Sequence, residues 1–564
     1  MAQTDLKNGA QIIVDCLRAE GVTHVFGVIG SAILDLLDII YQAPDMHYIR
    51  AQHEQGAAFM ADGYARATGK PGICVSTCGP GLTNMVSAIA GAYQENSPLI
   101  AISGEIHTQH YGKGNANFHE VNQESLLQPI TKMSKRVESP DRIAEFMRMA
   151  FRVAQSGRKG PVYLGMPRNI QKEQTAAEIW PVSAYRSEAQ PSGNPDAIDK
   201  ACELIMAAKS PVMLVGGGVR WTDAQADILR LAVDLGIPVA VSKKGMVPED
   251  HPWSVGVIGM VGCPVATEQV SSADLILALG CGFNQVTTAS FTHRIIPASA
   301  KIIQVDIDPT EFAKNYPIAL GITGEMAAVV RQMHQQLQPQ GGRGDREERL
   351  EKISRAKDEW EQRLAREEGS DDTVPINRLR LIRDVSRVAG ANAIISAESG
   401  STHGWAYYGF RSLTPMLEPG DLSCMGSGWC MAVGAKVAFP ERPAIAIIGD
   451  GAFMMTLNEL ASAVDNNIPV VVVVMHNEIY GNVTRKQYEH FNERFAGSRL
   501  YIPNLAAVAD AFGAYGQRVE QPEEIIPALE RALDSGRPAV LDVIVDNSRQ
   551  SLEPPVKLRV KDRY

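Results

Sequence analysis

Asp450 and Asn477 are oxygen-bearing residues whose types and spacing suit the binding of a divalent metal. Asp450 stands in a Gly-Asp-Gly triplet after the apolar run 444–448, and Asn477 follows the valine-rich run 470–475. The amphipathic stretch between the runs is long enough for a helix, which predicts two adjacent parallel strands. Ligands bind at the carboxyl ends of such strands. A carboxylate and an amide oxygen at that edge predict a Mg²⁺ ion that takes its remaining ligands from a diphosphate and water.

Glu54 marks a second candidate site in the N-terminal part of the chain. A run of small residues follows it and ends at Arg66, which predicts a helix packed closely against a neighbour. A glutamate in this position is most often an acid that interacts favourably with a helix N-terminus. His119, in the segment Phe118-His119-Glu120, is a further candidate because histidine transfers protons near neutral pH.

These residues need a scaffold of parallel strands, and the chain supplies short Val/Ile/Leu runs bounded by Gly and Pro. Such runs are typical of parallel strands buried on both faces. They alternate with amphipathic stretches, which predicts an α/β fold of three doubly wound parallel-sheet domains. We place these domains at residues 1–185, 190–340 and 370–564, with linkers at 187–196 and 338–352. The strand candidates are residues 24–30, 72–77, 99–104, 161–167, 211–218, 238–242, 275–282, 301–308, 393–399, 444–451, 470–477 and 539–546.

Composition excludes several classes of function. The chain has 564 residues, 45% hydrophobic and 21% charged, with a net charge of −10, which disfavours binding to nucleic acid or an anionic membrane. We expect a cytoplasmic protein, because the N-terminus has no signal-peptide pattern and no apolar run could span a bilayer. The cysteines lack zinc-site spacing, and most of them should be reduced and buried.

The segment from Asp450 to Asn477 resembles the diphosphate motif of thiamine diphosphate (ThDP) enzymes, with His476 in place of the first of the motif's two asparagines. The stretch His53-Glu54 to Arg66 resembles the one that carries their activating glutamate. The resemblance covers nearly the whole chain, and its closest pattern is the acetolactate synthase-like group. It implies pyrimidine-binding, middle and diphosphate-binding domains in that order. It also implies a homodimer or homotetramer with active sites at the subunit interface, where Glu54 of one subunit meets the diphosphate domain of another.

The resemblance assigns roles residue by residue. Glu54 would share a proton with N1′ of the aminopyrimidine and so favour the tautomer that deprotonates thiazolium C2. The metal ligands would be Asp450, Asn477 and the backbone carbonyl of Ile479. The residues that the resemblance places at the cofactor are Ile29, Gly30, Glu54, Pro80, Asn84, Gly400, Ser401, Thr402, Met425, Gly449, Asp450, Gly451, Ala452, Asn477, Ile479, Tyr480 and Gly481.

The reaction implied is bond cleavage or formation at a carbonyl carbon through an enamine. The segment 485–495 and residues 118–123 are similar to sulfoacetaldehyde acetyltransferases, which form acetyl phosphate and sulfite, so acyl transfer of this type is our main prediction. Arg485, Lys486 and Arg494 would then hold small anions. The alternative for these three residues is a set of exposed helix charges.

Three alternatives to this reaction stay open. The first is an acetolactate synthase-like 2-oxoacid decarboxylase and carboligase, although Lys486 stands where those enzymes have a Trp. The second is a 2-hydroxyacyl-CoA lyase, with His119 and Glu493 moving protons. The third is a non-catalytic ThDP-binding relative. Cys281 replaces an Arg that helps to hold FAD, so the middle domain could take FAD, ADP, CoA or nothing. The basic C-terminal residues 554–564 could fold over an anionic ligand.

Overall fold

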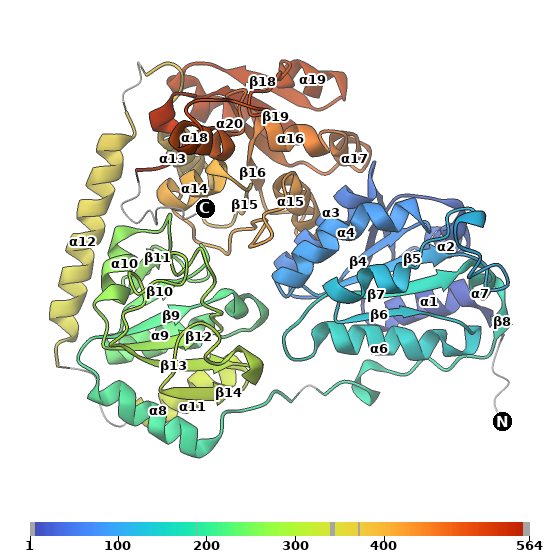
Figure 1. Ribbon diagram of the computed structural model, residues 1–564, viewed down its shortest axis with the longest axis horizontal. Coiled ribbons are helices and arrows are strands. Elements are labelled where there is room, and N and C mark those ends of the chain that lie inside the picture. Colours follow the sequence, from blue (N-terminus) through green and yellow to red (C-terminus); the bar gives the residue numbers. More distant parts are fainter. Residues whose placement is uncertain (1–5, 188, 339–343, 370–372, 556–564) are drawn as a thin grey trace.

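The computed structural model describes residues 6–187, 189–338, 344–369 and 373–555. They form three units, each a parallel sheet with helices on both faces (Figure 1). The N-terminal unit lies to the right of Figure 1 in blue, the middle unit to the lower left in green, and the C-terminal unit at the top in orange and red. No helix in the described ranges combines the length and the apolar character needed to cross a membrane.

The N-terminal sheet has the strand order β3-β2-β4-β5-β7-β6, and every pairing in it is parallel. Its central strands are buried on both faces, as their continuous apolar character predicts. A short antiparallel pair, β1 (Lys7–Asn8) with β8 (Gln174–Thr175), lies apart from the sheet. The elements are β2 (His24–Gly27), β3 (His47–Arg50), β4 (Gly72–Ser76), β5 (Leu99–Glu105), β6 (Met133–Arg136), β7 (Val162–Pro167), α1 (Gly9–Ala19), α2 (Leu34–Gln42), α3 (Glu54–Thr68), α4 (Pro80–Gln94), α5 (Gln123–Leu127), α6 (Ile143–Gln155) and α7 (Arg168–Lys172).

The middle sheet is also parallel throughout, in the order β11-β10-β9-β12-β13-β14. The long charged helix α12 (Arg346–Glu367) follows it and runs along the left edge of the molecule in Figure 1. The predicted linker at 338–352 therefore ends inside a helix. The other elements are β9 (Pro211–Val215), β10 (Val239–Val241), β11 (Ser254–Val257), β12 (Leu275–Leu279), β13 (Lys301–Asp306), β14 (Leu320–Thr323), α8 (Pro195–Ala207), α9 (Gln225–Leu235), α10 (Pro264–Ser271) and α11 (Met326–Leu337).

The C-terminal sheet has five parallel strands in the order β15-β16-β17-β19-β18. The amphipathic stretch expected between the two central strands is divided into two short helices, α16 and α17. The basic segment 556–564 lies outside the described residues. The elements are β15 (Ile394–Ala397), β16 (Ala444–Gly449), β17 (Val471–His476), β18 (Tyr515–Val519), β19 (Ala539–Ile544), α13 (Arg378–Ala389), α14 (Ser401–Gly409), α15 (Ser427–Ala438), α16 (Asp450–Thr456), α17 (Glu459–Asp465), α18 (Gly481–His490), α19 (Leu505–Ala511) and α20 (Ile525–Asp534).

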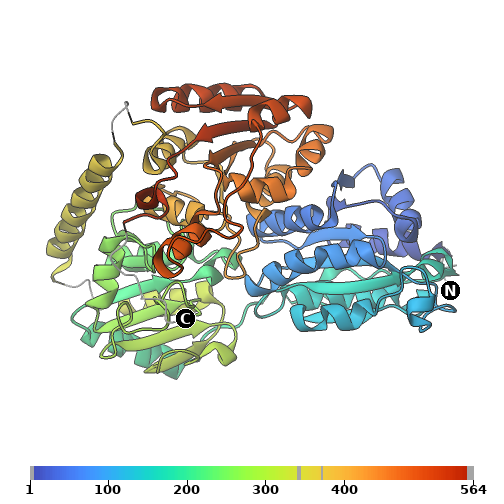
Figure 2. The ribbon, with the colours of Figure 1, turned by 45° about the horizontal axis from the view of Figure 1, so that its top comes forward.

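Helices α3 and α15 join the N-terminal and C-terminal units. Glycines allow the helices to touch through their backbones, because a Cβ at Gly63 would overlap the backbone of Met431 and a Cβ at Gly434 would overlap that of Met60. A single hydrophobic core accordingly contains residues of both units. Figure 2 shows α3 and α4 of the blue unit against the orange helices of the C-terminal unit.

Buried charges fix the junction of all three units. Lys243 of the middle unit makes ion pairs with Glu95 at the end of α4 and with Glu418 of the C-terminal unit, the latter at 3.2 Å. Glu418 also contacts His403 of α14 at 3.0 Å. Burial alone would raise the pKa of Glu418, but Lys243 and His403 hold it well below its usual range. Lys243 and its two carboxylate partners therefore stay charged at neutral pH and fix the relative positions of the units.

Candidate cofactor site

The carboxylate of Asp450 lies at the carboxyl edge of the C-terminal sheet, between the ends of β16 and β17. It is buried, and its Oδ2 accepts the N–H groups of Asn477 (2.8 Å) and Glu478 (2.6 Å). Its Oδ1 accepts the N–H of Gly451 at 2.7 Å. Burial raises the pKa of Asp450, although these three N–H groups oppose that shift. A carboxylate has about four lone-pair positions, so one position remains for a cation.

The amide of Asn477 lies beside the carbonyl oxygen of Ile479, and one of its two terminal atoms is 3.1 Å from that oxygen. A metal ion there would need this atom to be Oδ1, the orientation in which Oδ1 also accepts the Ile479 N–H at 3.4 Å. The loop is fixed from outside, because Tyr480 N–H donates to Ser498 O (2.9 Å) and Leu500 N–H to Glu478 O (2.7 Å). One carboxylate, one amide and one carbonyl form an oxygen-only set that fits Mg²⁺. No group of three or more His, Cys, Asp and Glu side chains with metal-site geometry occurs in the described part of the chain.

The predicted diphosphate loop begins helix α14 next to the Asp450 loop. Gly400 has φ +75°, and a Cβ there would meet nothing within 4 Å, so open space adjoins its backbone. Ser401 faces Gly481 at the start of α18, and the Thr402 hydroxyl faces Gly449 at the end of β16. Helix N-termini present free N–H groups, which suit phosphate oxygens. Glu398 supports the loop from below: it is fully buried and accepts the N–H groups of Ser399 (2.8 Å) and Gly428 (3.0 Å).

Glu54 begins helix α3 at the carboxyl edge of the N-terminal sheet. Its carboxylate is buried and accepts a hydrogen bond from Asn84 Nδ2 of α4 at 2.9 Å.

A residue that the sequence reasoning missed holds the N-terminal end of α3. Glu459 of α17 is buried and accepts the N–H groups of Gln52 (3.0 Å) and His53 (2.8 Å). Its position before the apolar Leu460 in the sequence gives no signal of a partner about four hundred residues away.

The loop that carries His119 packs on the Gly79-Pro80 turn. Gly79 has φ +64°, and a Cβ there would lie 2.6 Å from the His119 carbonyl oxygen. Gln123, a second residue that the sequence reasoning missed, accepts the Gly79 N–H at 2.7 Å and donates to Ser103 Oγ at 3.0 Å. His119 itself has φ +64° and stacks on Phe118 at 3.7 Å. Left-handed backbone at a non-glycine residue is strained and is found often at functional sites.

Apolar side chains around this loop face solvent in the single chain. The side chain of Phe118 is 79% exposed and that of Ile29 is 56% exposed. Gly30 packs on Thr77, next to the Gly79 turn, so Ile29 lies at the same sheet edge as His119. Exposed apolar groups beside a buried acid indicate a surface that a ligand or a second subunit covers.

The two halves of the predicted site lie far apart within one chain. Met60 is opposite Gly434 and Gly63 is opposite Met431, so α3 and α15 run antiparallel. Glu54 lies beyond one end of the contact and Met425 beyond the other. If this pairing is continued along α3, Met425 lies opposite position 69, which is 15 residues beyond Glu54. At a rise of 1.5 Å per residue, Glu54 and Met425 are about 22 Å apart along the helices.

Comparisons with known proteins identify the family of the chain. Family models match residues 7–126 as the thiamine pyrophosphate enzyme N-terminal TPP binding domain, 198–333 as the central domain, and 398–543 as the C-terminal TPP binding domain. A protein of Methanocaldococcus jannaschii named probable acetolactate synthase large subunit is 36% identical over 95% of this chain and 92% of its own length. The chain belongs to the thiamine pyrophosphate enzyme family. Thiamine pyrophosphate is another name for ThDP.

Two further relatives lie within the same group of ThDP enzymes. The acetolactate synthase isozyme 3 large subunit of Escherichia coli is 31% identical over 96% of both chains. The sulfoacetaldehyde acetyltransferase of Alcaligenes xylosoxydans xylosoxydans is 32% identical over 98% of this chain and 96% of its own length. The predictions of an acetolactate synthase-like ThDP enzyme and of three doubly wound α/β domains are confirmed.

In this ThDP enzyme, helix α18 carries the residues expected to bind substrate. The guanidinium of Arg485 pairs with Glu553 at 2.6 Å and with Glu489, so its charge is already matched by two carboxylates. Lys486 is half-buried on the same helix. Glu493 and Arg494 are exposed in the following loop, where Glu493 has φ +58°. Of the three basic residues expected to hold anions, Arg485 is therefore one whose charge is matched by carboxylates of the chain itself.

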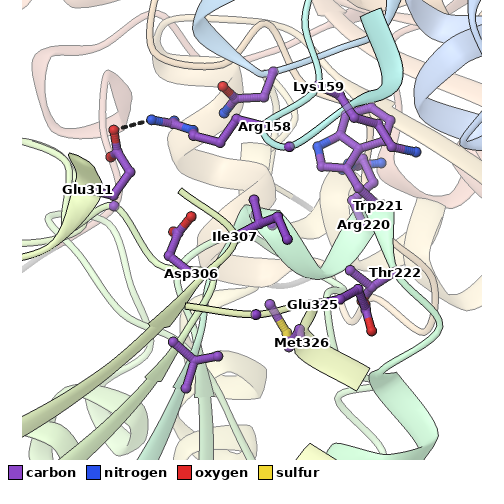
Figure 3. A pocket seen from close by; sticks show the side chains of 18 of the residues that line it. Arg158, Lys159, Arg220, Trp221, Thr222, Asp306, Ile307, Glu311, Glu325 and Met326 are labelled. Carbon is purple, nitrogen blue, oxygen red and sulfur yellow. Dashed lines mark ion pairs between the residues drawn. The ribbon is translucent and has the colours of Figure 1, made fainter. Parts of the chain in front are cut away.

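A separate pocket of about 1020 Å³ lies between the N-terminal and middle units (Figure 3). Its floor is the carboxyl edge of the middle sheet: Gly217 and Gly218 follow β9, Gly280 follows β12, and Asp306 ends β13. Its roof is the segment with Arg158 and Lys159 from the N-terminal unit. Figure 3 shows Arg158 reaching across to its ion-pair partner Glu311, and Lys159 beside Trp221. The three Lys132 hydrogen bonds to the carbonyls of Val153, Ser156 and Arg158 hold this roof segment.

Proposed function

We propose that this protein uses ThDP and Mg²⁺ to decarboxylate a 2-oxoacid and to join the acyl unit to a second carbonyl compound, as acetolactate synthases do. The observation that carries this proposal is the similarity to the Methanocaldococcus jannaschii relative, which extends over 95% of the chain. It favours the carboligase over our main prediction, acyl transfer from sulfoacetaldehyde. Lys486, in the place of a Trp of acetolactate synthases, argues that the acceptor differs from theirs.

The environment of α18 also favours the carboligase over acyl transfer from sulfoacetaldehyde. An acetyltransferase of this type would bind a sulfonate and a phosphate, and both need unmatched positive charge. Arg485 instead faces Glu489 and Glu553, and these carboxylates raise its pKa despite the opposing effect of burial. A guanidinium paired in this way offers little net charge to an incoming anion. Acyl transfer to phosphate remains the second candidate, because the sulfoacetaldehyde acetyltransferase relative matches 98% of the chain.

The residues of the chain would act at both ends of the cofactor. When bound, ThDP supplies a carbon nucleophile and accepts the electron pair released by decarboxylation. Asp450, Asn477 and the Ile479 carbonyl would hold Mg²⁺, and Ser401 and Thr402 would donate to diphosphate oxygens. Glu54, steadied by Asn84, would hold the proton at the aminopyrimidine. His119 and Glu493 are the candidates for moving a proton at the substrate. Phe118 and Ile29, on two loops at the same sheet edge, would exclude water.

The complete site would contain two subunits. A single chain separates Glu54 from Met425 by about 22 Å, more than a cofactor bound to both could span, given the rise of 1.5 Å per helical residue. A second copy that places its C-terminal unit against the exposed Ile29 and Phe118 would complete the site and cover these apolar groups. We therefore propose a homodimer, or a homotetramer built from such dimers.

We further infer that the pocket between the N-terminal and middle units binds a nucleotide. The ends of five strands of the middle sheet, β9, β10, β12, β13 and β14, line this pocket, and α/β sheets bind ligands at such strand ends. The carboxylate of Asp306 suits ribose hydroxyls, and the guanidinium of Arg220, which lines the pocket and donates to the neutral Met416 carbonyl, suits a phosphate. The pocket is large enough for ADP, and for the adenosine diphosphate portion of FAD or CoA.

The reaction is tested by supplying ThDP and Mg²⁺ and following substrates by NMR. With pyruvate labelled by ¹³C we expect CO₂ release and a labelled acetolactate-type product. Release of sulfite and acetyl phosphate from sulfoacetaldehyde and phosphate, with pyruvate unchanged, would reject the carboligase in favour of the acetyltransferase. The variant Glu54→Gln should bind ThDP but lose turnover. If it turned over as fast as the parent, Glu54 would have no role at the cofactor.

A further inference from the structure

Gln123 is a buried polar residue that directly follows the loop of His119. It begins α5 and is 1% exposed. Its Oε1 accepts the Gly79 N–H at 2.7 Å. Its Nε2 lies within hydrogen-bond distance of three acceptors of the N-terminal sheet, which are Gly104 O (3.0 Å), Ser103 Oγ (3.0 Å) and Tyr163 OH (2.9 Å). The amide therefore connects the interior of the sheet to the Gly79 turn.

The partners of this amide fix its orientation. The Gly79 N–H can only donate and needs the amide oxygen, whereas the Gly104 carbonyl can only accept and needs the NH₂ group. The Tyr163 hydroxyl donates to Glu105 Oε1 at 3.1 Å, so its oxygen is available to accept from the same NH₂ group. A reversed amide would place donor against donor at Gly79 and acceptor against acceptor at Gly104. Gln123 thus has one stable orientation, with its oxygen toward the turn.

The turn that Gln123 holds is the start of α4, and α4 contacts both oxygens of Glu54. Gly79 is the N-cap of α4, with φ +64° and ψ −112°. Asn84 of α4 donates to Glu54 Oε2 at 2.9 Å. A Cβ at Gly81 would lie 3.2 Å from Glu54 Oε1, so the first turn of α4 lies against this carboxyl group. A shift of the Gly79 turn would therefore move the groups that hold Glu54.

The same turn supports the His119 loop. A Cβ at Gly79 would lie 2.6 Å from the His119 carbonyl oxygen, so the two backbones are in contact. Gly79 thus touches the loop at His119 and donates a hydrogen bond to Gln123 at its end. One buried amide anchors both the loop of His119 and the helix that holds Glu54.

We propose that Gln123 is a positioning residue for proton transfer, which anchors the Gly79 turn to the sheet and so holds Glu54 and His119 in place. It acts through α4 and through the backbone of the loop, rather than by contact with the reacting atoms. A displacement of about 1 Å can reduce a rate about 100-fold when the reaction depends on exact placement. This inference rests on the proposed role of Glu54 at the aminopyrimidine.

A purely structural role of Gln123 makes a different prediction. Removal of the amide takes a hydrogen-bond partner from the buried Gly79 N–H, which lowers stability whatever the function of the turn. If stability were the only effect, the folded variant would still transfer protons at the parent's rate. If Gln123 positions Glu54, proton transfer will be slower in the folded protein, and only while residue 54 carries a carboxyl group.

The test is a double-mutant cycle that measures hydrogen–deuterium exchange at C2 of ThDP bound at saturation, by acid quench and NMR. We expect Gln123→Met to slow this exchange about 10–100-fold. In a Glu54→Gln background, Gln123→Met should cause little further slowing, because the group that it positions is gone. In the protein without ThDP, mass spectrometry should show faster exchange of the Gly79 amide hydrogen in Gln123→Met than in the parent.

The matched control is Gln332→Met in α11 of the middle unit. Its amide makes the same kinds of bond, because Oε1 accepts the Gly193 N–H at 2.8 Å and Nε2 donates to Gly193 O at 3.2 Å. This variant should lower the thermal midpoint without slowing exchange at C2. Far-UV circular dichroism checks that each variant folds.

Three results would overturn the proposal. They are an unchanged C2 exchange rate in folded Gln123→Met, equal slowing with and without the Glu54 carboxyl group, or equal slowing by Gln332→Met. If Gln123→Met does not fold, Gln123→Asn takes its place, because its amide is one methylene too short to reach both Gly79 and Gly104, and the same coupling to Glu54 is required. Exchange in Glu54→Gln as fast as in the parent would refute the proposed role of Glu54 itself. Slow exchange in Glu54→Gln with fast exchange in Gln123→Met would refute only the role of Gln123.

Discussion

Mixed oligomers give a direct test of whether each active site draws Glu54 and Asp450 from different chains. The perturbation combines Glu54→Gln, which removes the proton-holding carboxyl, with Asp450→Asn, which removes the charged metal ligand. Each variant alone should be inactive, because every site contains the defect. Co-expression of the two variants in equal amounts produces oligomers in which the defects are distributed at random.

The fraction of activity that the mixed oligomers should recover follows from the antiparallel contact of α3 with α15. Because Glu54 and Met425 are about 22 Å apart along the helices of one chain, a working site must take Glu54 from one subunit and the diphosphate side from another. An intact site then needs an intact Glu54 chain and an intact Asp450 chain. With random assembly each has a probability of one half, so about one quarter of the sites recover. If both residues came from one chain, no site would recover.

The assay measures turnover per chain in two samples. One is the unfractionated mixture, and the other is the mixed oligomer, which is purified through a different affinity tag on each variant. A matched control mixes the wild type with the double variant Glu54→Gln/Asp450→Asn. Shared sites again leave about one quarter of the activity in the unfractionated mixture, whereas sites within one chain leave about one half. The shared site would be refuted if the two single variants recovered no activity together while the control mixture kept about one half of the wild-type activity.

Three further predictions concern stability and the interdomain pocket. Gly434→Val should lower the free energy of unfolding by about 3 kcal/mol or more, because its side chain would overlap the Met60 backbone, whereas Gly344→Ala, with nothing within 4 Å, should change the thermal midpoint little. Burial lowers the pKa of His24 from 6.5 to about 4, helped by His47. The unfolded state therefore takes up the proton first, and urea unfolding should show stability that is full above pH 6.5 and declines toward pH 4. His24→Gln should flatten that part of the decline, and an unchanged pH profile would contradict it. ADP should raise the thermal midpoint of the parent, and Arg158→Glu should reduce this shift; equal shifts would place the nucleotide elsewhere.

The sequence predicted most of the sheet strands because buried parallel strands leave a strong local signal. Each strand candidate coincides with a strand of the structure. Within the three large sheets, the strands that it missed, β3, β6, β11, β14 and β18, are all at sheet edges. An edge strand has one hydrogen-bonded neighbour and is partly exposed, so its residues need not be continuously apolar. β6, with Met133-Ser134-Lys135-Arg136, is an example.

The motif residues were also predictable, because their spacing follows from the βα repeat. Asp450 and Asn477 end adjacent strands, so their side chains meet at one edge wherever the rest of the chain lies. Their neighbours in space were not predictable. Glu459 reaches the backbone of His53 over a long separation in sequence. Such contacts depend on how the three sheets pack, and no local pattern encodes them.

The sequence alone thus determined the family, the parallel sheets and the chemical types of the groups at each strand end, since local periodicity and motif spacing specify these. The tertiary structure decided which groups meet. It separated Glu54 from Met425 within one chain, because the glycines of α3 and α15 allow an antiparallel contact between backbones. It also paired Arg485 with carboxylates and set Gln123 against the Gly79 turn. Side-chain charge is a property of the residue, but its availability to a ligand depends on the partners that packing brings to it.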